Sequence, residues 1–528
     1  MMLSGRIECF SDRALVIHLV PLVRVCLISR EYPPDTGFGG IATFTRHLAQ
    51  GLKEIGHDVT VVALAKDGNP ACEQNDLGIP VHRVVPLSIG SDLGWSSLCM
   101  PYSRYVMRTN AGLFAKFLSL HNENPFDAVD TPELLAEGFY PAITKAAPLT
   151  VRLYTPHSKF IAEQLHNVTD TFDHQFVAMT ERMAMLSADV ITSPSRDLAE
   201  FVAGDLGIPL DDIDIVYNPI DADQFCPEGE KADFGKVAPT VLFVGRLEAR
   251  KGIHYLIDAI PQVVKAVPDV HFVIIGDDTQ NAQGQKSVLT EIKERLEATG
   301  CAASVTFIKR VLLSDLPLYY RAADVCVVPS LYDNSPYTCL EAMACGRAVI
   351  GTDGGGTKEY IVTGESGIIV PVKNADAIAK NIIHLLTDVV ERNRLETNAR
   401  TRVLAVFDRK RIAAETAKLY EKAQREFALS SKNPVCNLPV NRVLPVADEI
   451  LYSFDSMIGE LVLKASFRAR VRNWFELATK RPRLLVAKIM LANLKAFSFL
   501  FGGRNGAFIS KFENEVRDKE RSKLLFGQ

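Results

Sequence analysis

The stretch that decides the fold is "LVRVCLISREYPPDTGFGGIATFTRHLAQGLKEIG", residues 22–56. Its first eight residues are mostly apolar and rich in β-branched types, which predicts a buried strand. A loop containing Pro and Gly follows. Apolar residues then recur with the 3.6-residue period of a helix, which ends at Gly56. The periodic residues are Ile41, Phe44, Leu48, Leu52 and Ile55.

The same alternation of strand and helix continues along the chain in two series. Strand candidates in the first series lie at 22–29, 58–64, 127–130, 149–153 and 189–193, and in the second at 240–245, 270–278, 304–308, 324–330, 347–352 and 366–372. Near-continuous apolar strands separated by helices indicate parallel sheets covered on both faces. A polar segment punctuated by Pro and Gly, residues 217–239, separates the series as a linker. We therefore predict an α/β fold of two doubly wound Rossmann-like domains, residues 22–218 and 237–404.

Ligands of such sheets bind at the carboxyl ends of the strands, so the loops that follow strands are the candidate site. Gly39 and Gly40 run directly into the first helix, and a glycine pair there lets a phosphate or sugar approach backbone N–H groups. A tight turn without a ligand is the alternative. The loop matches neither the GxGxxG fingerprint nor the P-loop pattern, which argues against NAD and ATP.

Two further loops of this kind lie in the second series. "GRLEARKG" places Arg246 and Lys251 after a strand, where fixed cations could hold a diphosphate. "GTDGGGTKEY" places Gly355 and Gly356 after another strand, with Glu359 three residues on. A solvated basic loop is the alternative for the first. The coincidence of these signals at one predicted cleft is the argument for a site.

"YDNSPYTCLEAMACG", residues 332–346, predicts a helix over 336–345. Ser335 is a good N-cap, Pro336 suits the first helical position and Gly346 suits the closing left-handed residue. The acids Asp333 and Glu341 bracket the start of this helix, which is a natural seat for phosphate. Acids repel phosphate, so we expect them to serve hydroxyl groups of the same ligand, as in a nucleotide sugar. A plain helix start with solvated or cap-supporting acids is the alternative.

In this order, the motifs resemble the group 1 family of retaining glycosyltransferases with the GT-B architecture, over residues 22–427. That family has a glycine pair after the first strand, a "GR…KG" pair, and a Glu-x7-Glu motif before "AMA.G". The resemblance implies that Glu341 binds ribose hydroxyls, that Arg246 and Lys251 neutralise the donor diphosphate, and that Asp333 contacts the transferred sugar. Asp333 stands where Glu is commoner, which leaves the donor sugar open. The remaining donor-binding candidates are Gly39, Gly40, Asn334, Ser335, Pro336, Gly355 and Gly356.

The resemblance also implies roles in the first domain, on the acceptor side. His157, in "RLYTPHS", stands where relatives often carry a histidine that meets the donor sugar or the acceptor. A core or surface histidine without that role is the alternative. Residues 405–427 resemble the last helix of the family, which crosses back to pack on the first domain.

By the same resemblance the reaction is a retaining hexosyl transfer from a nucleoside diphosphate sugar, without a cofactor or metal, and the departing phosphate takes the acceptor proton. The acceptor is a glycan, a lipid-linked molecule or another hydroxyl compound, in polysaccharide or cell-envelope synthesis. A phosphorylase or epimerase on the same fold, or a non-catalytic binding protein, are the alternatives. Donor base, donor sugar and acceptor are not readable from the sequence.

Charge is nearly balanced over the 528 residues, with a net charge of −4, which gives no indication of nucleic acid binding. It is uneven, however: residues 451–528 hold 15 basic and 7 acidic residues, so the rest carries −12. Residues 428–528 are predicted to form a basic linker and a helical tail. Within it, the apolar stretch 484–501 with Lys488 and Lys495 suggests an interfacial helix on an anionic membrane. Packing on the protein body or on a partner is the alternative.

The ten cysteines form no CxxC pair and lie mostly in apolar runs, as in a reduced cytoplasmic protein. The apolar N-terminal stretch is interrupted by Pro21 and Arg24, so a signal peptide is not expected. Residues 1–21 are predicted to be an extension of unknown use. We therefore expect a cytoplasmic enzyme, with peripheral contact at the inner face of the membrane as a further hypothesis.

Overall fold

The computed structural model describes residues 22–430, apart from residues 38, 88–99, 163–167, 169, 236 and 281–285. The described residues of both sheets belong to one compact unit. The predicted extension 1–21 and nearly all of the predicted tail, including its membrane contact, lie outside the described residues. Among the described helices, none combines the length and the apolar character that a membrane span needs.

The first half of the chain forms an eight-stranded sheet in the order β3-β4-β2-β1-β5-β6-β7-β8. Neighbouring strands run parallel except for the antiparallel pair β3 and β4. The central strand β1 pairs on both sides, so that Leu27 lies opposite Val61 of β2 and Asp130 of β5. The strands are β1 (Arg24–Ile28), β2 (Asp58–Leu64), β3 (Cys72–Asp76), β4 (Ile79–Val84), β5 (Ala128–Pro132), β6 (Leu149–Arg152), β7 (Val190–Ser193) and β8 (Ile213–Ile215).

The five strands predicted for this half are confirmed as β1, β2, β5, β6 and β7. The sequence analysis missed β3, β4 and β8. Strand β3, "CEQND", is polar and largely exposed at the edge of the sheet, so it carries no apolar run. Strand β8 has only three residues at the other edge. Edge strands need less apolar sequence than central ones because one of their sides meets solvent.

Helix α1 (Gly40–Glu54) follows β1 as predicted. Four of its five periodic apolar residues are buried, namely Ile41, Phe44, Leu48 and Leu52. Each such burial contributes about 1.5–3 kcal/mol relative to an exposed side chain. The helix ends at the predicted place, because Ile55 is its C-cap and Gly56 adopts a left-handed φ of +100°.

The other helices of this half connect successive strands. They are α3 (Pro101–Glu123), the 3-10 turn η1 (Leu134–Ala136), α4 (Phe139–Thr144), α5 (His157–Ala162), α6 (Phe172–Leu186), α7 (Arg196–Leu206) and the 3-10 turn η3 (Leu210–Asp212). Ser195 caps α7, since its hydroxyl accepts a hydrogen bond from the Leu198 N–H at 3.3 Å. The start of α7 is therefore set by a side chain of its own loop.

The second half forms a six-stranded, fully parallel sheet in the order β11-β10-β9-β12-β13-β14. All six predicted strands are confirmed. Side chains alternate between two cores: Val241 and Phe243 of β9 face one, and Leu242 faces the other. The strands are β9 (Thr240–Val244), β10 (His271–Ile275), β11 (Val305–Ile308), β12 (Val325–Val328), β13 (Ala348–Thr352) and β14 (Ile368–Val370).

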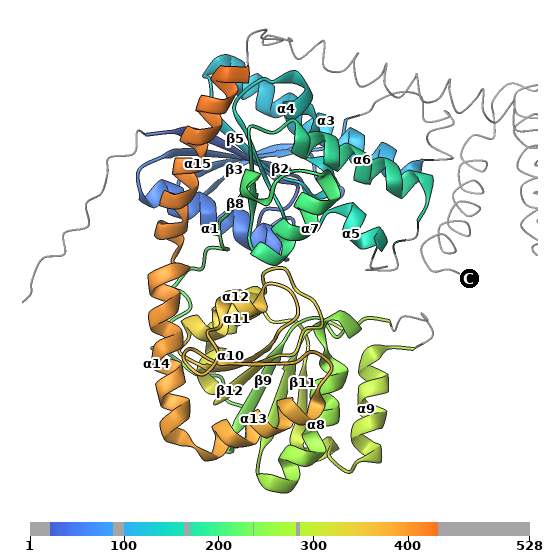
Figure 1. Cartoon of the computed structure of the whole chain (residues 1–528), viewed down its shortest axis with the longest axis vertical. Coiled ribbons are helices and arrows are strands. Elements are labelled where there is room, and N and C mark those ends of the chain that lie inside the picture. Colours follow the sequence, from blue (N-terminus) through green and yellow to red (C-terminus); the bar gives the residue numbers. More distant parts are fainter. Residues whose placement is uncertain are drawn as a thin grey trace, which may run out of the picture. The chain divides into compact units, whose positions relative to one another are not determined.

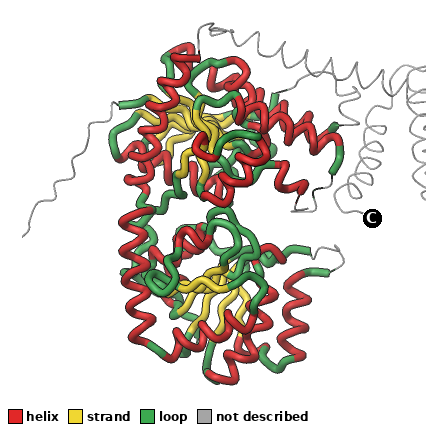
Figure 2. The backbone as a smooth tube through the Cα atoms, viewed as in Figure 1, coloured by secondary structure: helices red, strands yellow, loops and turns green. Residues whose placement is uncertain are grey.

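Helices surround the strands of each sheet, as Figure 2 shows. In the second half they are the 3-10 turn η4 (Ala249–Lys251), α8 (Ile253–Ala266), α9 (Val288–Ala298), the 3-10 turn η5 (Ala302–Ser304), α10 (Leu316–Ala322), α11 (Tyr337–Ala344), α12 (Thr357–Tyr360), α13 (Ala375–Thr387) and α14 (Val389–Val406). The fold class is therefore the predicted one, two doubly wound α/β sheets.

The last described helix, α15 (Arg409–Ser430), lies beside α1 (Figure 1). The buried Tyr420 hydroxyl donates a hydrogen bond of 2.8 Å to Asp130 in β5. Gly51 permits the close approach of the two helices, because a Cβ at that position would lie 2.6 Å from the carbonyl oxygen of Arg409. The chain thus returns from the second sheet to cover the first.

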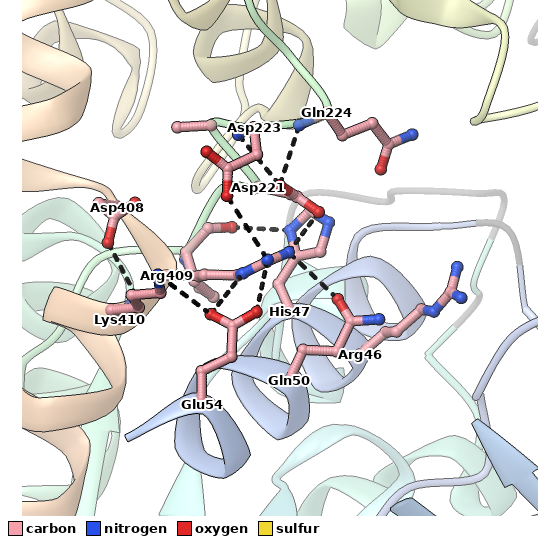
Figure 3. Close-up of polar contacts among 12 residues, drawn as sticks. Arg46, His47, Gln50, Glu54, Asp221, Asp223, Gln224, Asp408, Arg409 and Lys410 are labelled. Atoms are coloured by element: carbon pink, nitrogen blue, oxygen red, sulfur yellow. Dashed lines mark hydrogen bonds and ion pairs between the residues drawn. The ribbon is translucent and has the colours of Figure 1, made fainter. Parts of the chain in front are cut away.

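Two chain segments connect the sheets, and they run side by side. Ile220 and Asp408 form a parallel bridge, in which the Ile220 N–H donates to the Phe407 carbonyl at 2.9 Å. Arg409 fastens this crossing (Figure 3): its guanidinium bonds both carboxylate oxygens of Glu54, at 2.5 and 3.1 Å, and also pairs with Asp221. This group of charges, which we call the crossing network, joins α1, the linker and α15.

Candidate active site

A cavity of about 240 Å³ lies where the carboxyl ends of strands from both sheets meet. Its residues come from the loops and helix starts that follow strands, as expected for doubly wound sheets. The first half contributes Gly40, Ile41, Leu134, Tyr154, Thr155, Phe160, Pro194 and Asn218. The second half contributes Arg246, Arg250, Tyr332, Asp333, Asn334 and Ser335. All charged side chains in this described lining come from the second half.

Asp333 lies at the centre of a group of charges at this cavity. Its carboxylate forms an ion pair with the Lys251 ammonium and lies 3.9 Å from the Arg250 guanidinium. Burial by itself would raise the pKa of Asp333, but attraction to Lys251 and Arg250 outweighs burial and lowers it. The cluster therefore holds an ionised carboxylate beside two cations.

The turn η4 sets the position of Lys251. The next residue, Gly252, has a left-handed φ of +67°, and a Cβ there would lie 1.8 Å from the Pro329 carbonyl oxygen. Only glycine fits, so the strand-to-helix loop packs directly on the end of β12. The Leu331 N–H also donates to the Arg250 carbonyl at 2.8 Å. These contacts tie the cationic loop to the loop that carries Asp333.

Arg246 is the more exposed cation of the predicted pair, with a side chain that is 52% exposed against 20% for Lys251. Its guanidinium lies 3.4 Å from Glu248, which also pairs with Arg250 at 2.9 Å. Exposed ion pairs of this kind contribute little energy, so they exchange readily for a ligand. Arg246 lines the cavity, whereas Lys251 is not among its lining residues.

The helix after Asp333 is shorter than predicted and begins differently. Helix α11 spans Tyr337–Ala344, its N-cap is Pro336, and no side chain caps it. The prediction that Ser335 is the N-cap is wrong, because the Ser335 hydroxyl pairs with the Tyr360 hydroxyl instead. Gly346 closes the helix in the predicted left-handed conformation, with φ of +64°.

Asn334 reaches across to the first half of the chain. Its side-chain amide donates to the Thr155 hydroxyl at 2.5 Å and to the Tyr154 carbonyl. The Tyr332 hydroxyl in turn donates to the amide oxygen of Asn334. A predicted donor-binding residue thus also connects the two walls of the cavity.

Glu341 is buried one turn into α11. The Tyr320 hydroxyl donates to its carboxylate at 2.7 Å, and burial raises the pKa of Glu341 to about 7. The other contributions are smaller and lower the pKa: this hydrogen bond and attraction to Lys251. Glu341 is not among the cavity lining residues, so the structure places it in the core beside Tyr320 and not at the cavity surface.

Of the four predicted glycines, Gly355 and Gly356 lie at close backbone approaches, whereas Gly39 and Gly40 make only ordinary contacts. Gly39 is the N-cap of α1, and a Cβ on Gly40 would touch the ring of Tyr337 at 3.8 Å. Gly355 and Gly356 pack against the Asp333 loop. A Cβ on Gly355 would lie 2.3 Å from the Asp333 carbonyl oxygen, and a Cβ on Gly356 would lie 2.0 Å from the Asn334 carbonyl oxygen. The glycines of the second half therefore shape the loop that carries the charges.

His157 lies apart from the charges of the second half. It begins α5, its backbone N–H donates to Glu181 at 2.6 Å, and its ring nitrogen Nε2 lies 2.8 Å from Nδ1 of His174. Burial, and next the neighbouring His174, lower the pKa of His157 to about 4. The ring is therefore a neutral partner of His174, and the cavity is lined instead by Tyr154, Thr155 and Phe160 of this region.

Several residues at the site were not selected from the sequence. Arg250 lies in the "GRLEARKG" loop directly before Lys251, and its positive charge in that loop could have identified it as a candidate. Asn218, Pro194 and Thr155 carry no chemistry that marks them, and only the fold brings them to the cavity. Within the described ranges, no three His, Cys, Asp or Glu side chains gather as a metal site would require.

Comparison with known proteins agrees with this architecture. Residues 38–224 match the family model for Glycosyltransferase Family 4, and residues 229–402 match that for Glycosyl transferases group 1. The chain is 28% identical over 408 residues to an uncharacterised glycosyltransferase of Methanocaldococcus jannaschii, covering 76% of this chain and 98% of that protein. It is 26% identical over 430 residues to glycogen synthase of Mycobacterium tuberculosis, covering 79% and 98%.

Solved structures share the fold. Sucrose-phosphate synthase from Thermosynechococcus elongatus aligns with a TM-score of 0.62 and 24% identity, covering 77% of this chain and 100% of that one. The Anabaena protein HepE, solved in complex with UDP and glucose, aligns with a TM-score of 0.54 and 17% identity. The alignment covers 76% of this chain and 99% of the HepE chain. The chain therefore belongs to the group 1 family of glycosyltransferases, family 4 of the sequence-based classification, and has the GT-B architecture.

Proposed function

We propose that this glycosyltransferase moves a hexosyl group from a nucleoside diphosphate sugar to a hydroxyl acceptor with retention of the anomeric configuration. The observation that carries the proposal is the group of Lys251 and Arg250 around Asp333, at a cavity between the sheets that Arg246 also lines. Three cations near one buried carboxylate at a cavity suit a diphosphate joined to a sugar. Crystals of HepE that hold UDP and glucose support the same class of donor.

Each candidate residue then has a chemical task. Arg246 and Lys251 bind the diphosphate, and they exchange their present partners Glu248 and Asp333 for phosphate oxygens. Asp333, released from Lys251, accepts hydrogen bonds from hydroxyl groups of the transferred sugar. Glu341 accepts them from the ribose.

Backbone groups complete the donor site in this proposal. The N–H groups near Gly39, Gly40 and the start of α11 can donate to phosphate oxygens, because the first N–H groups of a helix have no partner within it. Gly355 and Gly356 act indirectly by shaping the loop of Asp333, Asn334 and Ser335. Pro336 contributes no N–H group and fixes the entry into α11.

The transfer breaks the bond between the anomeric carbon and the diphosphate oxygen and forms a bond to the acceptor oxygen. The acceptor proton passes to an oxygen of the departing phosphate, so no separate base is required. Positive side chains stabilise the charge that develops on the diphosphate, and a closed site with little water strengthens this effect. In this proposal the basic side chains replace a metal ion, and His157 orients the donor sugar or the acceptor.

The acceptor is a glycan, a lipid-linked molecule or another hydroxyl compound. Relatives named for glycogen synthesis and for mannosylation of phosphatidyl-myo-inositol support both classes. The same relatives support a proposed place in polysaccharide or cell-envelope synthesis, and we propose a cytoplasmic location from the cysteine pattern alone. Contact of residues 451–528 with the membrane stays a prediction about residues outside the described part.

The test begins with a panel of uridine, guanosine and adenosine diphosphate sugars, screened by thermal shift and by release of the free nucleotide with glycan acceptors. A bound donor raises the unfolding temperature by mass action. We expect one donor to bind and to be consumed, and Lys251→Ala to slow its consumption by about 100- to 1,000-fold. The matched control is Lys380→Ala, a change at an exposed lysine of α13. Binding without any turnover, across all donors and acceptors, would contradict the proposal.

A further inference from the structure

Glu359 of the second half binds the start of a helix that belongs to the first half. Its two carboxylate oxygens accept hydrogen bonds from the backbone N–H groups of Arg196, at 2.9 Å, and Asp197, at 3.2 Å. These are the first two residues of α7. The contact joins residues more than 160 positions apart in the sequence.

The start of α7 is incomplete without this carboxylate. The first N–H groups of a helix have no acceptor within it, and a negative charge there is favourable. Ser195 satisfies only the third of them, the Leu198 N–H. The Glu359 carboxylate accepts from the other two N–H groups, those of Arg196 and Asp197. If the halves separated, these two N–H groups could bond only to water.

Glu359 lies in the short helix α12, and side chains from other elements bind the end of this helix. Arg402 of α14 donates to the carbonyl oxygens of Glu359, at 3.0 Å, and Tyr360, at 2.7 Å. The Tyr360 side chain is buried, and its hydroxyl pairs with Ser335. Hydrogen bonds from Arg402 and the buried Tyr360 side chain therefore fix the backbone of Glu359, whose carboxylate binds α7.

The glycine loop of Gly355 and Gly356, which directly precedes α12, packs on the loop that carries Asp333. Gly355 forms a parallel bridge with Asp333, and the Gly356 N–H donates to the Asp333 carbonyl at 2.8 Å. A Cβ on Gly356 would lie 2.8 Å from the Cβ of Ser195, the cap of α7. Three segments, the Asp333 loop, the glycine loop and the start of α7, are therefore in direct contact.

The residue just before the cap of α7 is part of the cavity wall. Pro194 lines the same cavity as Asp333 and Asn334, whereas every cation of the described lining belongs to the second half. A displacement of α7 would move Pro194 in the first-half wall and leave the cations of the second half in place. Binding of the donor and transfer of the sugar should therefore respond differently to the loss of this contact.

We propose that Glu359 is a positioning residue that holds the start of α7, and with it the first-half wall of the cavity, against the donor-side loop during sugar transfer. This inference rests on the proposed function, because it concerns the geometry of that reaction. It gives Glu359 a role in turnover and none in recognition of the nucleotide.

The test compares Glu359→Ala and Glu359→Gln with Lys358→Ala. Lys358 is half exposed and forms only a 3.5 Å ion pair with Asp197, so its loss should change nothing measurable. Glu359→Ala should lower kcat about tenfold, since small displacements of reacting groups slow reactions by one to two orders of magnitude. The affinity for UDP or GDP, whichever the wild type binds, should stay within about twofold of its value. Glu359→Gln keeps one acceptor oxygen, so its kcat should lie between that of the wild type and that of Glu359→Ala.

A second readout separates positioning from simple stability. Small-angle X-ray scattering with saturating UDP or GDP should show that the wild type becomes more compact and that Glu359→Ala does so less. If Glu359→Ala does not fold, Glu359→Gln replaces it in both measurements. Wild-type kcat together with wild-type compaction would overturn the inference while leaving the proposed function intact. A wild type that binds neither nucleotide and transfers no sugar would instead contradict the proposed function.

Discussion

The molecule contains two networks of cations and carboxylates that connect separate segments, and they differ in what surrounds them. The donor-side cluster of Arg246, Arg250, Lys251 and Asp333 borders a cavity. The crossing network around Arg409 is enclosed by chain segments from α1, the linker and α15 (Figure 3). Ion pairs beside a cavity can exchange a partner for a ligand. Ion pairs enclosed between packed segments have no ligand with which to exchange, so they serve only to hold those segments together.

The surroundings of each network support this distinction. His47 of α1 lies behind the crossing network, with its ring nitrogen 3.1 Å from the Pro219 carbonyl oxygen, and burial lowers its pKa to about 4. Asp333 faces the cavity with its pKa lowered by Lys251 and Arg250 against the effect of burial. Similar residue types therefore hold packed segments together in one place and border a cavity in the other, where we propose that they bind the donor. Four predictions test this difference, from the largest expected effect to the smallest.

Lys251→Ala should separate recognition from assembly most clearly. We expect the turnover rate to fall by about 100- to 1,000-fold, as for loss of one preorganised donor at a developing charge. The urea midpoint should change little, because Arg250 remains 3.9 Å from the Asp333 carboxylate when Lys251 is removed. Steady-state kinetics and urea unfolding check the two halves of this prediction, with Lys380→Ala as the control. A large loss of stability with normal turnover would reverse the assignment of the two networks.

Arg409→Ala should have the opposite signature. It leaves Glu54 and Asp221 without their shared partner at a site where the Arg409 side chain is 13% exposed. We expect a loss of about 3 kcal/mol in the free energy of unfolding, as for removal of one partner of a largely buried pair. Turnover per folded molecule should stay near the wild-type value. Denaturant unfolding and active-site titration measure the two quantities, and unchanged stability would contradict the prediction.

The affinity for the donor should depend on pH through Glu341. Its pKa of about 7 lies above the ordinary value of 4.5, so the carboxyl is mostly protonated at pH 6 and ionised at pH 8. Because the ionised form accepts hydrogen bonds from ribose hydroxyls at both oxygens, affinity should rise about tenfold across this interval. Calorimetry with the active nucleotide sugar measures the profile. Glu341→Gln should give a flat profile, and a wild-type affinity that is flat or falls with pH would refute the role.

Arg411→Ala should give the smallest effect and serves as the matched control for Arg409. Arg411 lies two residues further along α15 and forms an exposed i,i+4 pair with Glu415 at 3.1 Å. Such pairs contribute about 0.3–0.5 kcal/mol. Unfolding in urea at low and high salt should show this small, salt-sensitive change. A loss as large as that of Arg409→Ala would mean that burial does not distinguish the two arginines.

The sequence alone predicted most central elements because their residues carry periodic, apolar patterns. The strands at 58–64 and 240–245 and the helix after Gly40 needed no tertiary information. The hairpin of β3 and β4 was missed because β3 is polar, and the Ser335 cap was wrong because the serine hydroxyl meets Tyr360 from a distant loop. Local preference fails where a long-range partner competes for the same group.

For the site, the sequence by itself determined which charges and glycines follow strands, namely Arg246, Lys251, Asp333 and the glycine pairs, because strand ends and helix starts are marked by local composition. Only the tertiary structure decided that Arg250 joins them, that Glu341 pairs with Tyr320, and that Glu359 caps a helix of the other half. Those outcomes depend on contacts between residues far apart in the chain. Such contacts follow from how the sheets pack together, which no local pattern encodes.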